Sequence, residues 1–160
     1  MEIVSATYSH VPEIVDLWKE FMDYGGSIDP LFSRREDGHL NFERYLKDLI
    51  KSDNSLVLVA LDKGHVVAYS ISQIFEYPPV FPQEKYGFIS DMAVKSKYPR
   101  KGIGSQMLAK IFEWFESRNM DKIELHVLAE NQIGYSFWKK HGFKDYMHVL
   151  YLNRKIRNEK

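Results

Sequence analysis

The sequence predicts an α/β or α+β fold, because segments with a strand pattern alternate with segments with a helical pattern. Apolar residues recur at helical spacing in four segments, and β-rich runs lie before and between them. No internal repeat, low-complexity tract or linker interrupts this order. A chain of 160 residues has the length of one domain and can bury roughly 70% of its unfolded surface. We therefore predict a single domain over residues 1–160.

The N-terminal part of the chain predicts one short strand and two helices. The strand covers residues 2–6. Apolar side chains at helical spacing predict the first helix over Val11–Tyr24, and the glycine pair at 25–26 is expected to end it. A polar loop over 27–38 contains an Asp-Pro pair, and the helical period returns over Leu40–Ile50.

The middle of the chain predicts a hairpin and a further strand. Two β-rich runs, Leu56–Leu61 and His65–Phe75, flank an Asp-Lys-Gly sequence at 62–64, which is typical of a tight hairpin turn. A proline-rich loop follows over Tyr77–Lys85, and Phe88–Val94 is expected to be the next strand.

The C-terminal part predicts two helices and two strands in alternation. A long amphipathic helix is expected over Ile103–Arg118 and a strand over Ile123–Leu128. The next helix covers about 132–141 and ends at Gly142, and a last strand is expected within Met147–Asn153.

Composition excludes several classes of protein. The 22 basic residues balance 22 acidic residues, which argues against bulk nucleic-acid binding. The chain has no cysteine, so neither a disulfide framework nor thiolate chemistry is expected. No apolar run is long enough to span a bilayer, and residues 1–7 lack a signal-peptide pattern. We expect a cytoplasmic protein that binds neither nucleic acid nor membrane.

The segment from Asp91 to Ser105 is the most informative one. A strand-like run ends there in a basic turn with two glycines, Gly102 and Gly104, which opens a helix. Helix N-termini bind phosphate through free N–H groups and the macrodipole. A nucleotide P-loop would need a longer loop ending in Gly-Lys-Ser/Thr, and a dinucleotide motif would need a third glycine where Met107 lies. A tight turn with no ligand is the remaining alternative.

Four pieces of the second half resemble the GNAT superfamily of acyl-CoA-dependent N-acyltransferases. They are the strand Phe88–Val94, the glycine turn at 99–104, the strand ending at Asn131, and the helix closing on Gly142 and Phe143. Their order and spacing are similar to the family's signature. The resemblance implies a mixed, mostly antiparallel sheet flanked by about four helices. That sheet would be splayed between the strands ending at Val94 and near Leu128, with acetyl-CoA in the opening.

The resemblance also implies which residues contact the cofactor. The strand would pair with the pantetheine arm, the turn would hold the pyrophosphate, and the last two residues would lie beside the arm and the thioester sulfur. The implied residues are Met92, Ala93, Val94, Arg100, Lys101, Gly102, Ile103, Gly104, Ser105, Asn131 and Trp138.

Two positions depart from the family's pattern. Pro99 lies where the family has Arg or Gln, which removes one N–H donor, although Arg100, Lys97 and Lys101 offer charge-assisted contacts instead. Trp138 replaces the tyrosine that often protonates the leaving thiolate in the family. Tyr135, three residues earlier, is a substitute acid on nearly the same helix face; simple packing is the alternative for both aromatic residues.

Two residues are candidates for the general base. His126 lies five residues before Asn131, on the opposite strand face from Leu125 and Val127. In some protein N-terminal acetyltransferases of the superfamily, the matching position carries a His or Glu that acts as a base. An imidazole with a pKa near ~6.5 suits proton removal. Asp91 is the rival, because other members use an acidic residue in the central strand. Structural roles remain the alternative for each.

The predicted function is acetyl transfer from acetyl-CoA to a primary amine by direct attack in a ternary complex, with no metal. The loops at 25–38 and 77–85 would select a small amine or a protein or peptide amine, and their acidic excess mildly favours a cation. A catalytically weak acyl-CoA-binding sensor is the alternative, motivated by Pro99 and Trp138. Dimers are common in the family, so a homodimer is also retained as an expectation.

Overall fold

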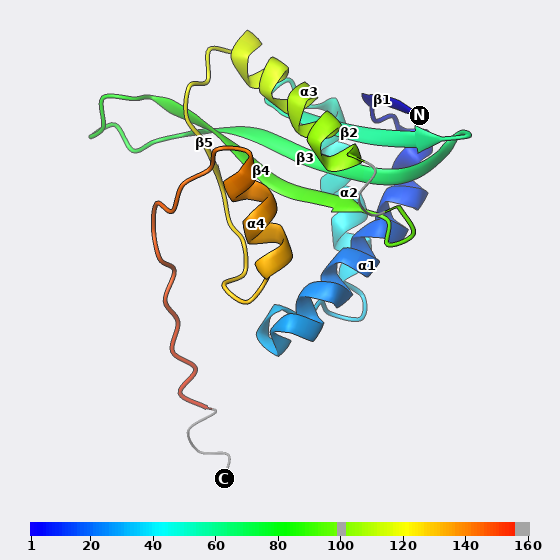
Figure 1. Cartoon of the computed structure of the whole chain (residues 1–160), viewed down its shortest axis with the longest axis horizontal. Coiled ribbons are helices and arrows are strands. Elements are labelled where there is room, and N and C mark those ends of the chain that lie inside the picture. The colour runs from blue at the N-terminus through cyan, green and yellow to red at the C-terminus, as the bar shows by residue number, and fades with distance from the viewer. Residues whose placement is uncertain (99–101, 156–160) are drawn as a thin grey trace.

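A computed structural model describes residues 1–98 and 102–155, which form a mixed sheet with helices on both faces (Figure 1). The described strands follow the order β1-β2-β3-β4-β5, antiparallel except for the parallel β4–β5 pair. The strands are β1 (Glu2–Ser5), β2 (Ser55–Asp62), β3 (His65–Glu76), β4 (Lys85–Val94) and β5 (Ile123–Leu125). The helices are α1 (Val11–Ile28), α2 (Gly38–Lys51), α3 (Ile103–Ser117) and α4 (Gln132–Lys140), with 3₁₀ turns η1 (Tyr8–His10) and η2 (Pro30–Phe32). The predicted fold class is confirmed.

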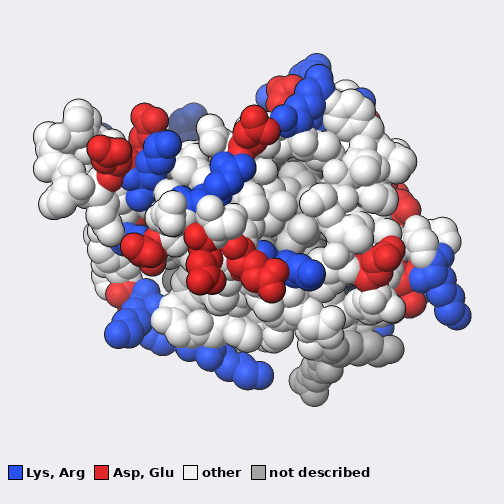
Figure 2. Space-filling model, turned by 90° about the horizontal axis from the view of Figure 1, so that it is seen from above, with Lys and Arg blue, Asp and Glu red and all other residues white. Residues whose placement is uncertain are grey.

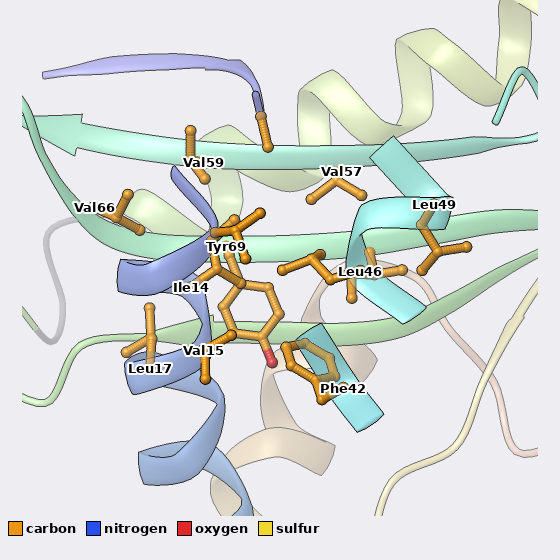
Figure 3. Packing of buried hydrophobic residues seen from close by; sticks show 13 residues of the cluster. Ile14, Val15, Leu17, Phe42, Leu46, Leu49, Val57, Val59, Val66 and Tyr69 are labelled. Carbon is orange, nitrogen blue, oxygen red and sulfur yellow. The ribbon is translucent and has the colours of Figure 1, made fainter. Parts of the chain in front are cut away.

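Two apolar clusters lie on opposite faces of the sheet. One packs α1 and α2 on the sheet around the fully buried Tyr69 (Figure 3). The other packs α3 on the opposite face around Met107 and Phe115. Successive side chains of a strand alternate between faces, so Tyr69 and Ile71 face α1 and α2 whereas Ala68 faces α3.

Helix α1 does not end at the glycine pair, so that prediction was wrong. The helix continues to Ile28. A Cβ at Gly25 would lie 2.6 Å from Cδ1 of Phe32, so this glycine permits a close contact with η2 rather than ending the helix. The helix ends instead before Pro30, where Asp29 has an extended backbone and accepts a hydrogen bond from the N–H of Leu31.

The hairpin, strand β4 and helix α3 agree with the prediction from the sequence. Lys63 and Gly64 both have positive φ, at 51° and 81°, as the two central residues of a tight hairpin turn require. The predicted strand and helix at 88–94 and 103–118 appear as β4 and α3 with small changes at their ends.

The end of the chain differs from the prediction. Strand β5 stops at Leu125 instead of Leu128, and residues 147–153 form no strand. A β-strand requires a neighbouring strand for its backbone hydrogen bonds, and the structure places none beside 147–153 within the described ranges. The β-rich composition of these residues is therefore not sufficient for a strand in a single chain.

Strands β4 and β5 separate partway along β4. They pair only from Gly87 to Ile89, opposite Ile123–Leu125, although β4 continues to Val94. At the separation point Ser90 is an extra residue in the β3–β4 register, a β-bulge that bends the strand. The sheet is therefore splayed where the cofactor is expected.

The molecule shows no single-sign charged face in the view of Figure 2, where acidic and basic side chains are interspersed. In the described ranges 1–98 and 102–155, none of the helices has the length and apolar character needed to cross a membrane.

Candidate active site

The open edge of β4 lies beside the first turn of α3. A Cβ at Gly104 would lie 3.9 Å from Sδ of Met92, so the two segments are in contact. Gly102 begins the helix with φ of 73° and offers no side chain to cap it. The N–H groups of the first turn have no partner within the helix and carry its positive partial charge. This arrangement fits a phosphate group. Pro99, Arg100 and Lys101 lie outside the described residues.

Helix α4 packs against the start of α3 through Gly104 and Ser105. A Cβ at Gly104 would lie 3.2 Å from the Phe137 ring, which indicates a close approach of the two helices. The hydroxyl of Ser105 lies 3.0 Å from Nε2 of His141. The Ser105 side chain therefore has a partner at the end of α4, whereas its backbone N–H belongs to the first turn of α3. The Ser105–His141 pair was not foreseen from the sequence.

Asn131 is the N-cap of α4. Its Oδ1 accepts a hydrogen bond from the N–H of Gly134 at 3.0 Å, which fixes the orientation of the side chain. Its Nδ2 group makes no hydrogen bond with residues 1–98 or 102–155 and is available there as a donor. As the N-cap, Asn131 satisfies an N–H group of the first turn, which explains why α4 begins directly after it. Asn131 is also one of the residues predicted to bind the cofactor.

The two aromatic residues expected near the thioester have different environments. Trp138 packs edge-on against Phe137 and Phe143, with ring centroids 5.0 and 5.3 Å away. The hydroxyl of Tyr135 donates to both oxygens of Asp145, at 2.9 and 3.1 Å. That hydrogen bond is the main cause that raises the pKa of Tyr135 above its ordinary value. Its proton is thus already committed to a carboxylate.

Asp91 faces α1 and α2, on the opposite side of β4 from Met92. The hydroxyl of Tyr69 donates to its Oδ2 at 2.8 Å. Burial raises the pKa of Asp91, although hydrogen bonds from Tyr69 and Ser90 act in the opposite direction. Burial also raises the pKa of Tyr69 well above its ordinary value, so Tyr69 keeps its proton and donates it.

Replacing Asp91 with Asn should stabilise the fold at neutral pH. The raised pKa means that ionised Asp91 is less favourable in the folded chain than in the unfolded chain. The wild type therefore loses stability as pH rises from 3.8 through the raised value, whereas Asp91→Asn loses none from this group. Thermal unfolding between pH 3 and pH 7 should show a stability gain at pH 7 that disappears near pH 3. Exposed Asp16→Asn is the control, and an equal gain there would contradict the expectation.

His126 follows β5 on the same face of the sheet as Asp91. Its ring meets the Phe88 ring edge-on at 5.1 Å, and its side chain is exposed. Glu124, two residues earlier, accepts a hydrogen bond from the hydroxyl of Tyr77 at 2.9 Å and lies 3.3 Å from Nζ of Lys122. The structure therefore places both base candidates on the α1/α2 face. Glu124 is not among the residues predicted for the site from the sequence, although its two-residue spacing from His126 predicts a shared strand face.

The loop between β3 and β4 closes one end of this face. The rings of Tyr77 and Tyr86 stack at 4.4 Å, and Phe81 packs on Tyr77 at 5.7 Å. They border a pocket of 330 Å³. Four aromatic residues, three polar or charged residues, one proline and one methionine line it: Tyr77, Phe81, Tyr86, Tyr146, Gln83, Lys122, Glu124, Pro82 and Met147. Within the described residues, no group of three or more His, Asp and Glu side chains is arranged to hold a metal ion.

Comparison with known proteins gives a family match over most of the chain. The model of the acetyltransferase (GNAT) family matches residues 12–143. An uncharacterized N-acetyltransferase of Archaeoglobus fulgidus is 28% identical over 131 residues, which cover 82% of this chain and 84% of that protein.

Solved structures share the fold at low sequence identity. A mutant of the BH1408 protein from Bacillus halodurans has a TM-score of 0.88 at 24% identity, over 96% of this chain and 99% of the other. A predicted acetyltransferase from Clostridium acetobutylicum, solved with acetyl-CoA, has a TM-score of 0.78 at 20% identity over 95% of each chain. The four resembling motifs, the splayed sheet and the family match agree, and the chain belongs to the acetyltransferase (GNAT) family.

Proposed function

We propose that the protein transfers an acetyl group from acetyl-CoA to a primary amine by direct attack in a ternary complex. The observation that carries the proposal is the uncapped start of α3 beside the unpaired edge of β4. When bound, acetyl-CoA supplies an activated thioester. Backbone groups of Met92, Ala93 and Val94 would hold its extended arm, and N–H groups from Gly102 to Ser105 would hold its pyrophosphate, with Arg100 and Lys101 adding charge.

The α1/α2 face is the proposed acceptor side. It carries the carboxyl groups of Asp91 and Glu124 and the aromatic side chains of Phe88 and Tyr77, which together suit a cationic amine with an apolar body. An alkylamine with a pKa near ~10.4 is almost fully protonated at pH 7, so the site must remove a proton. We assign this role to His126, because its exposed ring is available to the acceptor, whereas Asp91 is bonded to Tyr69.

Departure of the CoA thiolate needs little help from an acid, since a thiol pKa near ~8.5 makes it a good leaving group. Asn131 would hold the pantetheine arm through its free Nδ2 group. Trp138 would form part of the wall near the sulfur rather than supply a proton, given its packing against Phe137 and Phe143. In this proposal Tyr135 does not protonate the thiolate, because its hydroxyl donates to Asp145.

The proposal also covers domain organisation, cellular location, acceptor and assembly. The single domain over residues 1–160 is supported by the family match over residues 12–143. The cysteine-free sequence is compatible with a cytoplasmic protein. We keep both a small amine and a protein amine as acceptors, and a homodimer as the assembly.

Release of CoA with a panel of amines tests this function directly. The chain has no cysteine, so a thiol-reactive dye reports only the CoA that is produced. We expect steady turnover with at least one primary amine at pH 7–8. Binding of acetyl-CoA without turnover on any small amine or lysine peptide would contradict the enzyme and favour an acyl-CoA-binding sensor.

Gly102→Ala should weaken acetyl-CoA binding by about tenfold. A side chain on a residue with φ of 73° introduces about 1–2 kcal/mol of backbone strain. The start of α3 can relieve this strain only by shifting the N–H groups that are proposed to bind the pyrophosphate. Gly64→Ala is a matched control, because Gly64 also has positive φ and open space where a Cβ would lie, but belongs to the β2–β3 turn. Isothermal titration of both variants measures the difference. Equal affinities would show that the start of α3 does not hold the cofactor.

A further inference from the structure

A row of ring side chains crosses the α1/α2 face of the sheet toward the end of the β3–β4 hairpin. Paired residues of neighbouring strands share a face, so Phe75 of β3 lies on the same face as Tyr86 and Phe88 of β4. The Phe75 ring contacts those of Phe88 and Tyr86, with centroids 5.7 and 5.9 Å away. Phe88 contacts His126 at 5.1 Å, and Tyr86 stacks on Tyr77 at 4.4 Å. These five residues form one aromatic row that runs from His126 to Tyr77.

The aromatic row is open to a ligand. Figure 1 shows the β3–β4 hairpin projecting beyond α1 and α2, which cover the rest of this face. Among the described residues, the buried cluster beneath these two helices includes no member of the row. Phe75 is 37% exposed, and His126 is exposed as well. A group of accessible rings that begins at the proposed base is a surface on which a substrate can lie.

The far end of the aromatic row opens into the pocket of 330 Å³, because Tyr77 and Tyr86 belong to its lining. This volume is at the low end of the range for small-molecule sites and fits a single ring system. Inside the pocket, Glu124 accepts a hydrogen bond from Tyr77 and lies 3.3 Å from Nζ of Lys122. The charges of Glu124 and Lys122 offset each other. The pocket therefore favours an uncharged ring over a second ammonium group.

We propose that the acceptor is an arylalkylamine, whose amine lies at His126 and whose aromatic ring lies on Phe75 and Tyr86. The inference rests on the proposed function, which assigns His126 to the acceptor amine. In the transfer, the amine nitrogen forms an amide bond with the acetyl group and the thioester bond breaks. His126 takes one proton of the ammonium group, and the CoA thiolate takes the other.

The spacing along β4 suits an amine of this kind. Phe88 and Tyr86 are two residues apart, about 7 Å at a rise of ~3.4 Å per residue, and a short alkyl linker with one ring covers such a distance. Aromatic rings in contact gain more than the burial of their area alone, because their quadrupoles attract in tilted and offset arrangements. Phe75 and Tyr86 would therefore determine the selectivity for an aromatic acceptor over an alkyl one.

Binding of two matched amines tests the ring contact without reference to catalysis. 2-Phenylethylamine and 2-cyclohexylethylamine share the linker and the number of ring atoms, but only the first has an aromatic ring. In isothermal titrations with and without CoA, we expect the wild type to bind 2-phenylethylamine about threefold to tenfold more tightly. Phe75→Leu should lose most of this preference. Tyr8→Leu is the matched control, since Tyr8 is 46% exposed in η1, and it should keep the preference.

Turnover of the same amines separates a failure of this inference from a failure of the proposed function. Acetylation of 2-phenylethylamine with a preference in kcat/KM that Phe75→Leu abolishes would support both. No preference in the wild type, an unchanged preference in Phe75→Leu, or faster turnover of spermidine or a lysine peptide would overturn the inference alone. If 2-phenylethylamine binds as expected but no amine is acetylated, the proposed function fails and the aromatic amine is a ligand rather than an acceptor.

Discussion

His126→Ala is expected to lower kcat by at least tenfold at pH 7, because a positioned general base typically contributes about 10²–10⁴-fold. The imidazole acts as a base only when neutral, so wild-type activity should fall on the acidic side of the pH–rate profile. Removing the ring removes the group that causes this fall. The acidic limb of the pH–rate profile should therefore flatten in the variant, and a pH series from 5.5 to 9 measures it.

Two further variants separate a base from a structural residue. His65→Ala removes a histidine whose side chain is 79% exposed on the β2–β3 hairpin and should leave both kcat and the pH profile unchanged. Asp91→Asn should keep the acidic limb that His126 produces, even if the rate falls. If His126→Ala retains the wild-type profile while Asp91→Asn loses it, the base is Asp91.

Elements that depend on local chemistry followed from the sequence. The Asp-Lys-Gly sequence predicts the tight turn in which Lys63 and Gly64 have positive φ. The glycine turn likewise predicts where α3 begins. The glycine pair after Tyr24 was misinterpreted because the reason for Gly25 is non-local, namely the Phe32 ring packed on it. The strand expected within 147–153 failed for the same kind of reason, since a strand forms only beside a partner.

The site shows the same division between local and non-local information. The capping role of Asn131 is local, and its position follows from the helix that begins after it. The Tyr69–Asp91 hydrogen bond depends on the β3–β4 register, which the bulge at Ser90 shifts by one residue. Because the register is not known from the sequence alone, the contact between these two side chains could not be predicted. Glu124 was accessible in principle, because a two-residue spacing from His126 is sufficient to predict a common face.

The second large effect is expected for Phe115→Ala, which should lower the free energy of unfolding by about 3–5 kcal/mol. Its ring is fully buried in the α3-side cluster and lies directly against Gly87. Removing the ring would leave a cavity behind β4 that the surrounding backbone cannot close. Urea unfolding followed by circular dichroism measures the loss. Phe81, which is 57% exposed, is the control, and Phe81→Ala should change stability by less than about 1 kcal/mol.

Gly87 makes the same contact testable from the other side. A Cβ there would lie 2.5 Å from Cε1 of Phe115, so Gly87→Ala should overpack the site and cost about 1–3 kcal/mol. In the double variant Gly87→Ala, Phe115→Leu, the smaller side chain makes room for the new methyl group, and the loss should be less than the sum of the single losses. Additive losses would show that the two residues do not share one packing site.

This contact lies where β4 and β5 are still paired, since Gly87 is opposite Ile123. The absence of a side chain at 87 lets α3 approach the sheet closely at the paired end, while the strands separate beyond Ile89. A loosened contact at Gly87 should therefore disturb the opening between β4 and β5 as well as the core. We therefore expect Phe115→Leu to bind acetyl-CoA more weakly than the wild type, measured at a temperature where both proteins are fully folded. Unchanged affinity would show that the packing at Gly87 does not affect the opening between β4 and β5.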